Sequence, residues 1–305
     1  AARSRRLRRD SLGMNHILAL VTSHFRPSPL ATRQPDFYHG LLEVGLPHRL
    51  AMDKNSKIYV AGHTGLVGSA ILRQLRATGY ARLLTAGRDQ VDLTVQAAVD
   101  QLFEREKPEY VFLAAARVGG ILANDTYPGS FIRDNLLIQT HVVDAANRNG
   151  VTKLLLLESA CIYPRLAPQP ISEDDLLGGP LEPTNTPYAV AKIAGIMMAQ
   201  AYRKQYGLNA ICLMPTNLYG PGDNFDPRDS HVAPALLRKV HEAKMSNAPH
   251  VVVWGTGEAR REFLYVDDMA DAAIFMMRNY NSGKIVNIGV GQDVSVTELV
   301  KLMME

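Results

Sequence analysis

Short apolar runs alternate with longer segments of helical periodicity from about residue 57 onward. Each run is continuous rather than interrupted by polar residues, which is typical of strands buried on both faces of a parallel sheet. This alternation predicts an α/β fold with a doubly wound parallel sheet, of the Rossmann type, whose helices cover both faces. The predicted strands are 57–62, 82–87, 110–115, 154–159 and 210–215, and the helices between them are about 66–79, 94–106, 130–149 and 188–206.

The pattern changes near residue 216, where Pro, Gly, Asp and Asn become frequent. We predict a smaller lobe there, with a short helix and a strand at "VVVW" (251–254), before a helix at 266–280 and a strand at 284–289. A last helix starts near residue 295 and the sequence stops inside it, so a truncated lobe is expected. The predicted domains are a dinucleotide-binding domain at 54–220 and about 262–290, and a substrate lobe at about 221–261 and 291–305.

The amino-acid composition excludes several classes of protein. Hydrophobic residues make up 47% of the 305 residues, yet no apolar run reaches the ~18 residues that span a bilayer, so no membrane association is expected. The chain has two cysteines, Cys161 and Cys212, which indicates a reducing compartment, the cytoplasm, rather than a disulfide framework. No cluster of His, Cys and acidic residues has the spacing of a metal site, so no metal is expected.

The charge is unevenly distributed. Residues 1–51 carry eight arginines and three acids, a net charge of +5, while the rest of the chain has a net charge of −2. The nearly neutral body does not indicate nucleic-acid binding. Residues 1–53 are predicted to be an extension outside the folded domain, with an organelle transit peptide as the alternative reading of its arginines.

A glycine-rich loop, "GHTGLVG" at 62–68, follows the first predicted strand and opens the first helix. Glycines at this place let the backbone turn tightly and approach a pyrophosphate, which the free N–H groups of the helix N-terminus then bind. The loop therefore predicts a dinucleotide site. Arg88, at the end of the second strand, favours the 2′-phosphate of NADP, and Asp92 is a candidate for contact with the adenine.

A tyrosine and a lysine lie one helical turn apart in "PYAVAKIAG", at Tyr188 and Lys192. Both side chains leave the same face of the helix. A neighbouring ammonium lowers the pKa of a phenol, which then gives a proton more readily to a carbonyl under reduction. Ser159, at the end of the fourth strand, is placed where such sheets bind ligands and can hold the substrate oxygen.

The glycine loop, the serine at the strand end and "YAVAK" resemble the extended short-chain dehydrogenase/reductase superfamily. Longer segments, including "SACIYPR", "LEPTNTPYAVAKIAGI" and "VVVWGTGEARREFLYVDDMA", resemble the GDP-L-fucose synthase family within it. The resemblance covers residue 57 to the end of the chain. It implies a homodimer that uses NADP for 3,5-epimerisation and 4-reduction of the GDP-sugar substrate GDP-4-keto-6-deoxy-D-mannose.

The resemblance also implies site residues beyond Ser159, Tyr188 and Lys192. Cys161 and His231 are the expected proton carriers of the epimerisation, since a thiol and an imidazole titrate close enough to neutrality. Lys239, Trp254 and Arg261 are the expected contacts of the GDP-sugar. The residues expected at the cofactor are Gly62, His63, Thr64, Gly65, Leu66, Val67, Gly68, Arg88, Leu157, Glu158, Ala160, Pro215, Thr216, Asn217 and Leu218.

Three positions depart from the family pattern, one of them Arg117, where the family usually has a lysine. Thr64 replaces a basic residue in the glycine loop, and Glu158 replaces the glycine before the serine, where an added carboxylate is expected to repel phosphate or fill the space of the nicotinamide. Two further hypotheses therefore stay open: a paralogue that binds nucleotide without turnover, and another nucleotide-sugar epimerase or reductase of the same fold.

Overall fold

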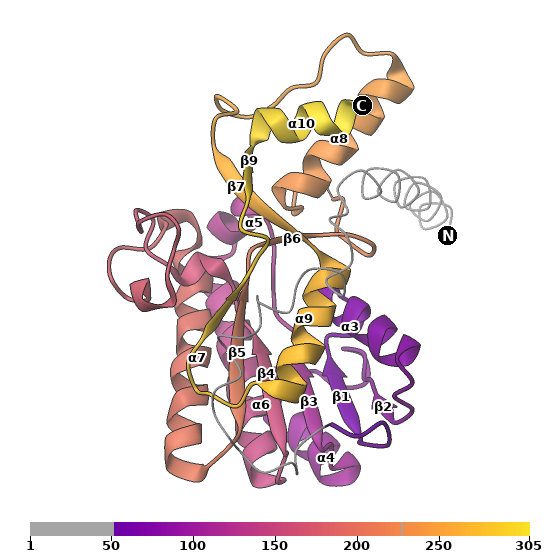
Figure 1. Ribbon diagram of the computed structural model, residues 1–305, viewed down its shortest axis with the longest axis vertical. Coiled ribbons are helices and arrows are strands. Elements are labelled where there is room, and N and C mark those ends of the chain that lie inside the picture. The colour runs from indigo at the N-terminus through magenta and orange to yellow at the C-terminus, as the bar shows by residue number, and fades with distance from the viewer. Residues whose placement is uncertain (1–51, 227) are drawn as a thin grey trace.

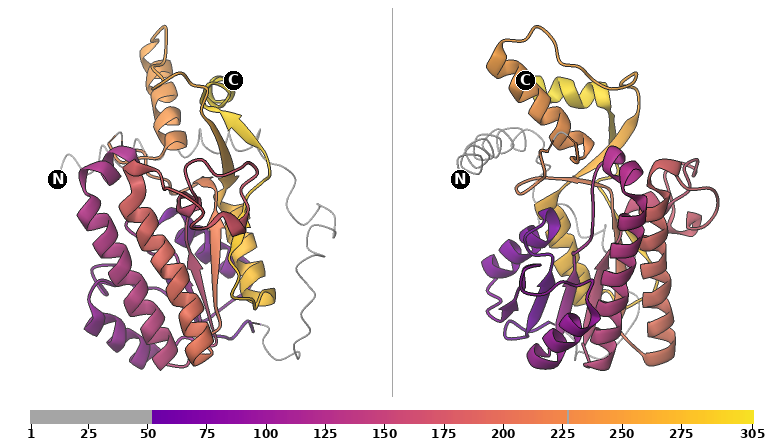
Figure 2. Two further views of the ribbon diagram at one scale, coloured as in Figure 1. Left: turned by 90° about the vertical axis from the view of Figure 1, so that its left-hand side faces the viewer. Right: turned by 180° about the vertical axis from the view of Figure 1, so that it is seen from behind.

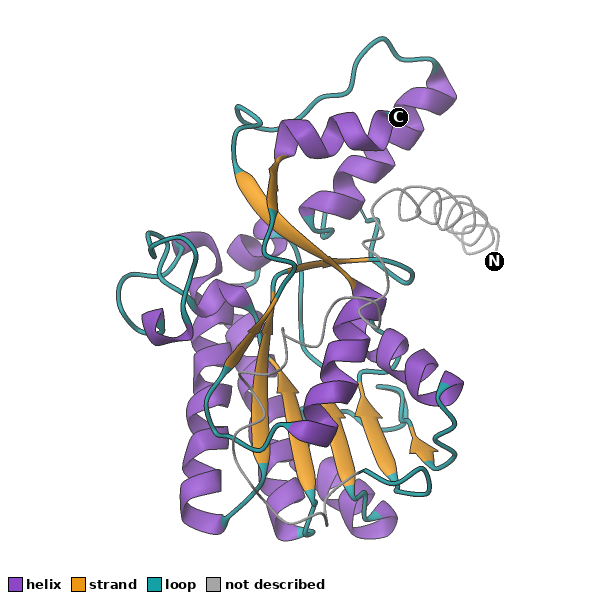
Figure 3. Ribbon diagram, viewed as in Figure 1, coloured by secondary structure: helices purple, strands orange, loops and turns teal. Residues whose placement is uncertain are grey.

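The computed structural model describes residues 52–226 and 228–305, so most of the predicted extension lies outside the described residues. Its central sheet has six strands in the order β2-β1-β3-β4-β5-β8, all parallel (Figures 1 and 3). The doubly wound sheet expected from the apolar runs is confirmed. The strands are β1 (Ile58–Ala61), β2 (Leu83–Leu84), β3 (Tyr110–Leu113), β4 (Lys153–Leu157), β5 (Ala210–Pro215) and β8 (Val286–Ile288).

The strand residues alternate between two hydrophobic cores, one on each face of the sheet. On one face Ile58 and Val60 of β1 pack with helices α3 and α9, and on the other Tyr59 and Ala61 pack with α4, α6 and α7. Burial on both faces explains why each strand reads as an unbroken apolar run. The helices are α3 (Leu66–Ala77), α4 (Gln96–Glu106), α6 (Pro128–Arg148), α7 (Thr186–Tyr206) and α9 (Val266–Asn279).

The topology reverses direction between β1 and β3. The chain moves from β1 outward to β2, then returns to the other side of β1 and continues through β3, β4 and β5. Loops that follow neighbouring strands diverge at such a point and leave a crevice at the carboxyl edge of the sheet. The glycine loop and the end of β4 both lie at that edge, so the fold brings the predicted cofactor and catalytic segments together.

A second sheet, in the order β6-β7-β9, forms the smaller lobe beyond the carboxyl ends of the central strands (Figure 1). Helices α8 and α10 pack against each other through a small apolar cluster that includes Ala233, Leu236 and Leu299. The elements of this lobe are β6 (Asn217–Tyr219), β7 (Arg260–Tyr265), β9 (Asp293–Ser295), α8 (Val232–Ser246) and α10 (Val296–Met304).

The predicted strand at 251–254 is wrong, since this segment has no regular structure and the strand of the lobe is β7. The Val252 carbonyl accepts a hydrogen bond from Lys239 Nζ at 3.1 Å, and Val253 packs against the cluster of α8 and α10. A side chain and local packing thus replace strand pairing, which the β-branched composition alone cannot reveal.

The sequence pattern also missed the short helix α5 (Ile121–Thr126). Its start is held by Asn124, whose buried Nδ2 donates to the Gly119 and Gly120 carbonyls, and by Gly120 N, which donates to the Asp229 carbonyl. The last contact joins α5 to the loop that precedes α8. This helix therefore depends on a distant segment rather than on its own six residues.

Candidate active site

The glycine loop is shaped by two close approaches of backbone to backbone. A Cβ at Gly62, whose φ is +83°, would lie 2.6 Å from Ala115 N at the end of β3, and a Cβ at Gly68 would lie 2.1 Å from Gly62 O. Neither position tolerates a side chain. The loop is thereby pressed into the topological switch point, as a dinucleotide site requires.

The N-terminus of α3 fits an anionic group. No side chain caps this helix, so its first N–H groups stay available, and the dipole adds partial positive charge. His63 Nδ1 is buried within the loop without a hydrogen-bond partner. These features fit the pyrophosphate of a dinucleotide.

Arg88 lies exposed beyond β2, with Nε 3.5 Å from Asp92 Oδ2. Asp92 accepts hydrogen bonds from Thr94 N at 2.9 Å and Thr94 Oγ1 at 2.7 Å. The Thr94 hydrogen bonds and the Arg88 charge lower the pKa of Asp92. Because the ion pair is exposed and long, it costs little to release Arg88 toward a phosphate.

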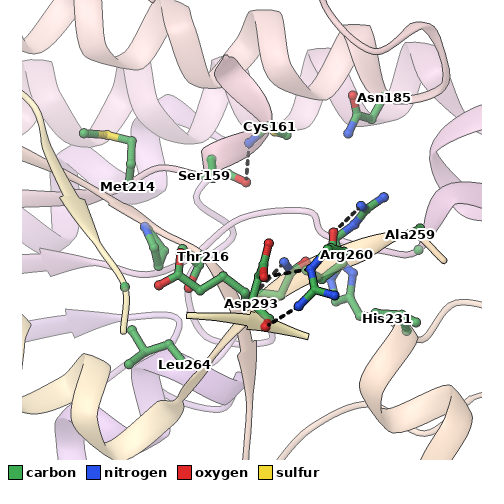
Figure 4. Close-up of a pocket in the computed structure, with 18 of the residues that line it drawn as sticks. Ser159, Cys161, Asn185, Met214, Thr216, His231, Ala259, Arg260, Leu264 and Asp293 are labelled. Carbon is green, nitrogen blue, oxygen red and sulfur yellow. Dashed lines mark hydrogen bonds and ion pairs between the residues drawn. The ribbon is translucent and has the colours of Figure 1, made fainter. Parts of the chain in front are cut away.

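Four of the five predicted catalytic residues line one cleft of about 2390 Å³ between the two sheets. Tyr188 comes from α7. Ser159 and Cys161 come from the end of β4, and His231 is the N-cap residue of α8 (Figure 4). Ser159 Oγ accepts a hydrogen bond from Cys161 N at 3.4 Å and starts a single 3-10 turn (Ala160–Ile162). This turn fixes the hydroxyl and the thiol two residues apart at the end of β4.

The fifth residue, Lys192, lies beneath the cleft rather than in its wall. Its Nζ stands 5.8 Å from the centre of the Tyr188 ring and donates to the Leu157 carbonyl at 2.7 Å. The Phe131 ring meets Tyr188 edge to face at 6.4 Å. One helical turn therefore does place the lysine beside the tyrosine, as the spacing predicts.

The electrostatic effect on Tyr188 differs from the prediction. Burial raises the pKa of Tyr188 well above its ordinary value, and the nearby Cys161 and Glu158 raise it further. Burial is the largest of these causes, and Lys192 also pairs with Glu158, whose Oε2 lies 3.2 Å from Nζ. The carboxylate balances the positive charge that was expected to act on the phenol alone.

Glu158 does not occupy the cleft, contrary to the expectation that it crowds the nicotinamide. Its side chain is fully buried, and Oε2 accepts from Gln139 Nε2 of α6 at 3.3 Å. A Cβ at Gly195 of α7 would lie 2.7 Å from Glu158 Oε1, so a glycine there makes room for the carboxyl group. The side chain therefore points between α6 and α7, away from the ligand.

The two predicted proton carriers are held in neutral forms. Burial raises the pKa of the Cys161 thiol to about 11, partly offset by Ser159 and Lys192. Loss of contact with water beside the surrounding protein atoms lowers the pKa of the His231 imidazole, and the charge of the Asp229 carboxylate opposes this effect. The cleft thus presents a thiol and a neutral imidazole from different walls.

The predicted substrate residues line the outer part of the same cleft. Trp254 is 75% exposed, with Lys239 Nζ 4.8 Å from its ring centre, so it is no core residue. Arg261 Nη1 donates to the Arg260 carbonyl at 2.7 Å, whereas Arg260 is tied to Asp293 at 2.9 Å. Arg261 is therefore freer than Arg260 to meet a phosphate.

Some of the predicted cofactor residues at the end of β4 and around β6 line the cleft, and others lie outside its lining. Ala160, Pro215, Thr216 and Asn217 line the cleft, and Thr216 Oγ1 is buried without a partner. The glycine loop, Arg88, Leu157, Glu158 and Leu218 are outside its lining.

Sequence reasoning missed two polar residues of the cleft wall. Asn185 Oδ1 and Ser230 Oγ are buried without a hydrogen-bond partner, and both residues line the cleft. Unpaired buried polar atoms are costly unless a ligand satisfies them. Their positions next to identified residues, one turn before Tyr188 and directly before His231, were the available signal.

Two negative observations apply to residues 52–226 and 228–305. Three His, Cys, Asp or Glu side chains nowhere gather closely enough there to bind a metal ion. Over the same residues, no helix has both the length and the apolar character to cross a membrane.

Comparisons with known proteins agree with this geometry. Residues 58–289 match the NAD dependent epimerase/dehydratase family. A curated relative, probable GDP-L-fucose synthase 1 of Oryza sativa subsp. japonica, is 58% identical over 268 residues, which is 87% of this chain and 82% of the relative.

Solved structures give the same picture. A GDP-6-OMe-4-keto-L-xylo-heptose reductase from C. jejuni is 38% identical with a TM-score of 0.80, covering 83% of this chain and 84% of the reductase. A GDP-L-fucose synthetase from Naegleria fowleri bound to NADP is 30% identical with a TM-score of 0.77, covering 83% and 78%.

Proposed function

The chain belongs to the NAD dependent epimerase/dehydratase family, and on that premise we propose that it is a GDP-L-fucose synthase. Its reaction is the NADP-dependent 3,5-epimerisation and 4-reduction of GDP-4-keto-6-deoxy-D-mannose to GDP-L-fucose. The observation that carries the proposal is the cleft that holds Ser159, Cys161, Tyr188 and His231 together. A reduction alone needs no thiol and imidazole from opposite walls.

Reduction uses the end of β4 and the start of α7. When bound, NADPH supplies the hydride for C4 of the sugar. Ser159 Oγ holds the 4-keto oxygen, and Tyr188, kept protonated by burial, gives it a proton. Lys192, beneath the cleft, stays close enough to hold the nicotinamide ribose and to stabilise the phenolate that remains.

Epimerisation uses the two proton carriers. The 4-keto group acidifies the hydrogens on C3 and C5, so a base can remove each one and an acid can return a proton on the other face. Cys161 approaches from the central sheet, and His231 approaches from α8 in the lobe. Opposite walls are the arrangement that inversion at carbon requires.

The remaining assignments belong to the same proposal. The cofactor is NADP, with its pyrophosphate at α3 and its 2′-phosphate at Arg88; the bound cofactor of the Naegleria fowleri structure supports this choice. Lys239, Trp254 and Arg261 contact the GDP moiety. The dinucleotide-binding domain comprises residues 54–220 and about 262–290, and the substrate lobe comprises about 221–261 and 291–305.

A cytoplasmic homodimer completes the proposal. Helices α6 and α7 pack along each other on one side of the molecule (Figure 2). Val190 and Met197 of α7 are exposed large apolar side chains. We assign the dimer contact to this face. Light scattering of the purified chain, with Met197→Lys as the disrupting variant, distinguishes dimer from monomer.

The test of the reaction is incubation with GDP-4-keto-6-deoxymannose and NADPH or NADH. We expect NADPH consumption and formation of GDP-L-fucose, with a preference for NADPH. Absence of NADPH consumption by the folded chain would overturn the proposal, and equal rates with NADH would remove Arg88 from the 2′-phosphate.

Cys161→Ser separates the two half-reactions. We expect it to abolish exchange of solvent deuterium into C3 and C5 of the sugar and to leave most of the reduction of an already epimerised intermediate. Cys212→Ala is the matched control, because Cys212 lies buried in β5 outside the cleft. Equal loss of exchange and reduction would contradict the role of Cys161.

A second candidate is another GDP-sugar reductase of the same fold, favoured by the TM-score of 0.80 to the heptose reductase. Substrate profiling with GDP-4-keto hexoses and heptoses decides between them. The hypothesis of a chain without turnover loses its main support, because Glu158 leaves the cleft open.

A further inference from the structure

The buried carboxyl group of Glu158 has no role in the reaction described so far. Its side chain is 0% exposed, that of Lys192 is 4% exposed, and Oε2 and Nζ are 3.2 Å apart. A buried charge without a partner is strongly destabilising, so neither group can be explained without the other.

The buried Glu158–Lys192 pair is surrounded by groups of three neighbouring elements. Gln139 Nε2 donates to Glu158 Oε2, and the backbone N–H of Glu158 donates to the Leu213 carbonyl at 2.9 Å. A Cβ at Gly195 would lie 2.7 Å from both Glu158 Oε1 and Gln139 Oε1. Residues of α6 and α7 thus surround the carboxyl group, and β5 holds the backbone that carries it.

Three titratable groups besides Lys192 feel the charge of Glu158. They are Tyr188 on α7, Cys161 on the 3-10 turn and Cys212 on β5. Burial raises the pKa of each group, and the Glu158 carboxylate adds a smaller rise. Burial raises the pKa of Glu158 itself, and Lys192 opposes this rise. Two of the three neighbours are the groups to which we assign proton transfer.

We propose that Glu158 is a positioning residue, which holds the Lys192 ammonium at the end of β4, beside the Tyr188 phenol. It touches neither substrate nor cofactor and acts through Lys192 and through its field. By opposing loss of a proton from both acids, it keeps the phenol and the thiol protonated to higher pH than a neutral residue at this position would.

The inference rests on the proposed function for its meaning but is tested first without turnover. Alkylation of Cys161 by iodoacetamide reports the thiolate fraction, and peptide mass spectrometry separates Cys161 from Cys212. Glu158→Gln removes the charge at nearly constant shape. A loss of one nearby charge lowers the thiol pKa by about one unit, which raises the thiolate fraction about tenfold at about pH 8.

The intrinsic reactivity of the thiolate falls about threefold over the same change, so the net expected increase in alkylation rate is about threefold. Glu158→Asp keeps the charge and is expected to stay near the wild-type rate. Asp271→Asn is the control, because Asp271 is a half-buried carboxyl that is also bonded to a glutamine, Gln74 of α3, and it lies on α9 outside the cleft lining.

The second readout is the pH profile of kcat for reduction. In Glu158→Gln the alkaline limb, where Tyr188 loses its proton, is expected about one pH unit lower than in wild type. Should this variant fail to fold, Glu158→Gly takes its place, because the Leu157 carbonyl still holds Lys192.

The outcomes are distinct. An alkylation rate and a pH profile that both equal wild type in Glu158→Gln, or in Glu158→Gly, overturn the inference, because the carboxyl group then carries no charge that matters. A shift of the same size in Asp271→Asn also overturns it. Faster alkylation in a chain that never consumes NADPH supports the field of Glu158 and refutes only the proposed function.

Discussion

A buried lysine lies at each end of strand β4: Lys153 belongs to the strand itself, and Lys192 reaches its other end from α7. The two ammonium groups differ in their partners. Lys153, the first residue of β4, donates to the Met276 and Met277 carbonyls at 3.0 and 2.7 Å. Lys192 donates to the Leu157 carbonyl at the other end and also has the Glu158 carboxylate.

The physical consequence is a difference in charge. Burial lowers the pKa of Lys153 to about 7, with a smaller effect of Arg203, since carbonyl dipoles alone do not repay the loss of water. Lys192 has the Glu158 carboxyl group beside it, at 3.2 Å. Lys153 thus has only carbonyl partners and lies at the end of β4 away from Tyr188, whereas Lys192 has a carboxyl partner and lies beside the phenol that it is proposed to stabilise.

The largest expected effect follows from removing the catalytic lysine. Lys192→Met leaves Tyr188 without a neighbouring cation and the buried Glu158 carboxyl group without its ion-pair partner. We expect kcat for reduction to fall at least about 100-fold and the free energy of unfolding to fall by about 3 kcal/mol. Steady-state NADPH oxidation and urea denaturation measure the two.

The corresponding substitution at the start of β4 is Lys153→Met. We expect kcat within about twofold of wild type, because Lys153 is not among the residues that line the cleft. We expect a loss of about 1 to 2 kcal/mol in unfolding free energy, because the Met277 carbonyl loses its donor, whereas the Met276 carbonyl keeps Tyr280 N at 3.0 Å. A large loss of kcat in a folded Lys153→Met protein would erase the distinction between the two lysines.

The pH dependence of stability sharpens the comparison. Between about pH 7 and 10 the folded state holds fewer protons on Lys153 than the unfolded state, whose lysine has an ordinary pKa. Stability from this group therefore rises with pH, by up to about 1.4 kcal/mol per unit, and is flat below that window. The difference in unfolding free energy between wild type and Lys153→Met, measured across the window, gives the slope; a falling difference contradicts the assignment.

The smallest effect concerns Gly195, which makes room for Glu158 and Gln139. Gly195→Ala adds a Cβ 2.7 Å from an oxygen of each. The gain in helix propensity, about 1 kcal/mol, offsets part of the crowding, so the net loss is about 1 kcal/mol. In a Glu158→Gly background the loss should shrink or reverse, and a double-mutant cycle of unfolding free energies measures the coupling.

Much of the fold was predictable because its signals are local. The β1 to β5 runs are apolar on both faces, and the glycine loop must be glycine wherever backbone meets backbone. The segment 251–254 misled the prediction because its β-branched residues pack beside α8 without a strand partner. The helix α5 was invisible because its start depends on the loop before α8, which is about 100 residues away in sequence.

The candidate site divides in the same way. The spacing of Tyr188 and Lys192, the serine at the end of β4 and the loop at 62–68 are properties of the sequence, because helix and strand periods fix which side chains share a face or an edge. The direction of Glu158 is not such a property. Only the packing of α6 and α7 beside β4 decided that this carboxylate turns away from the cleft and pairs with Lys192, since burial, which controls both charge and pKa, exists only once the helices meet.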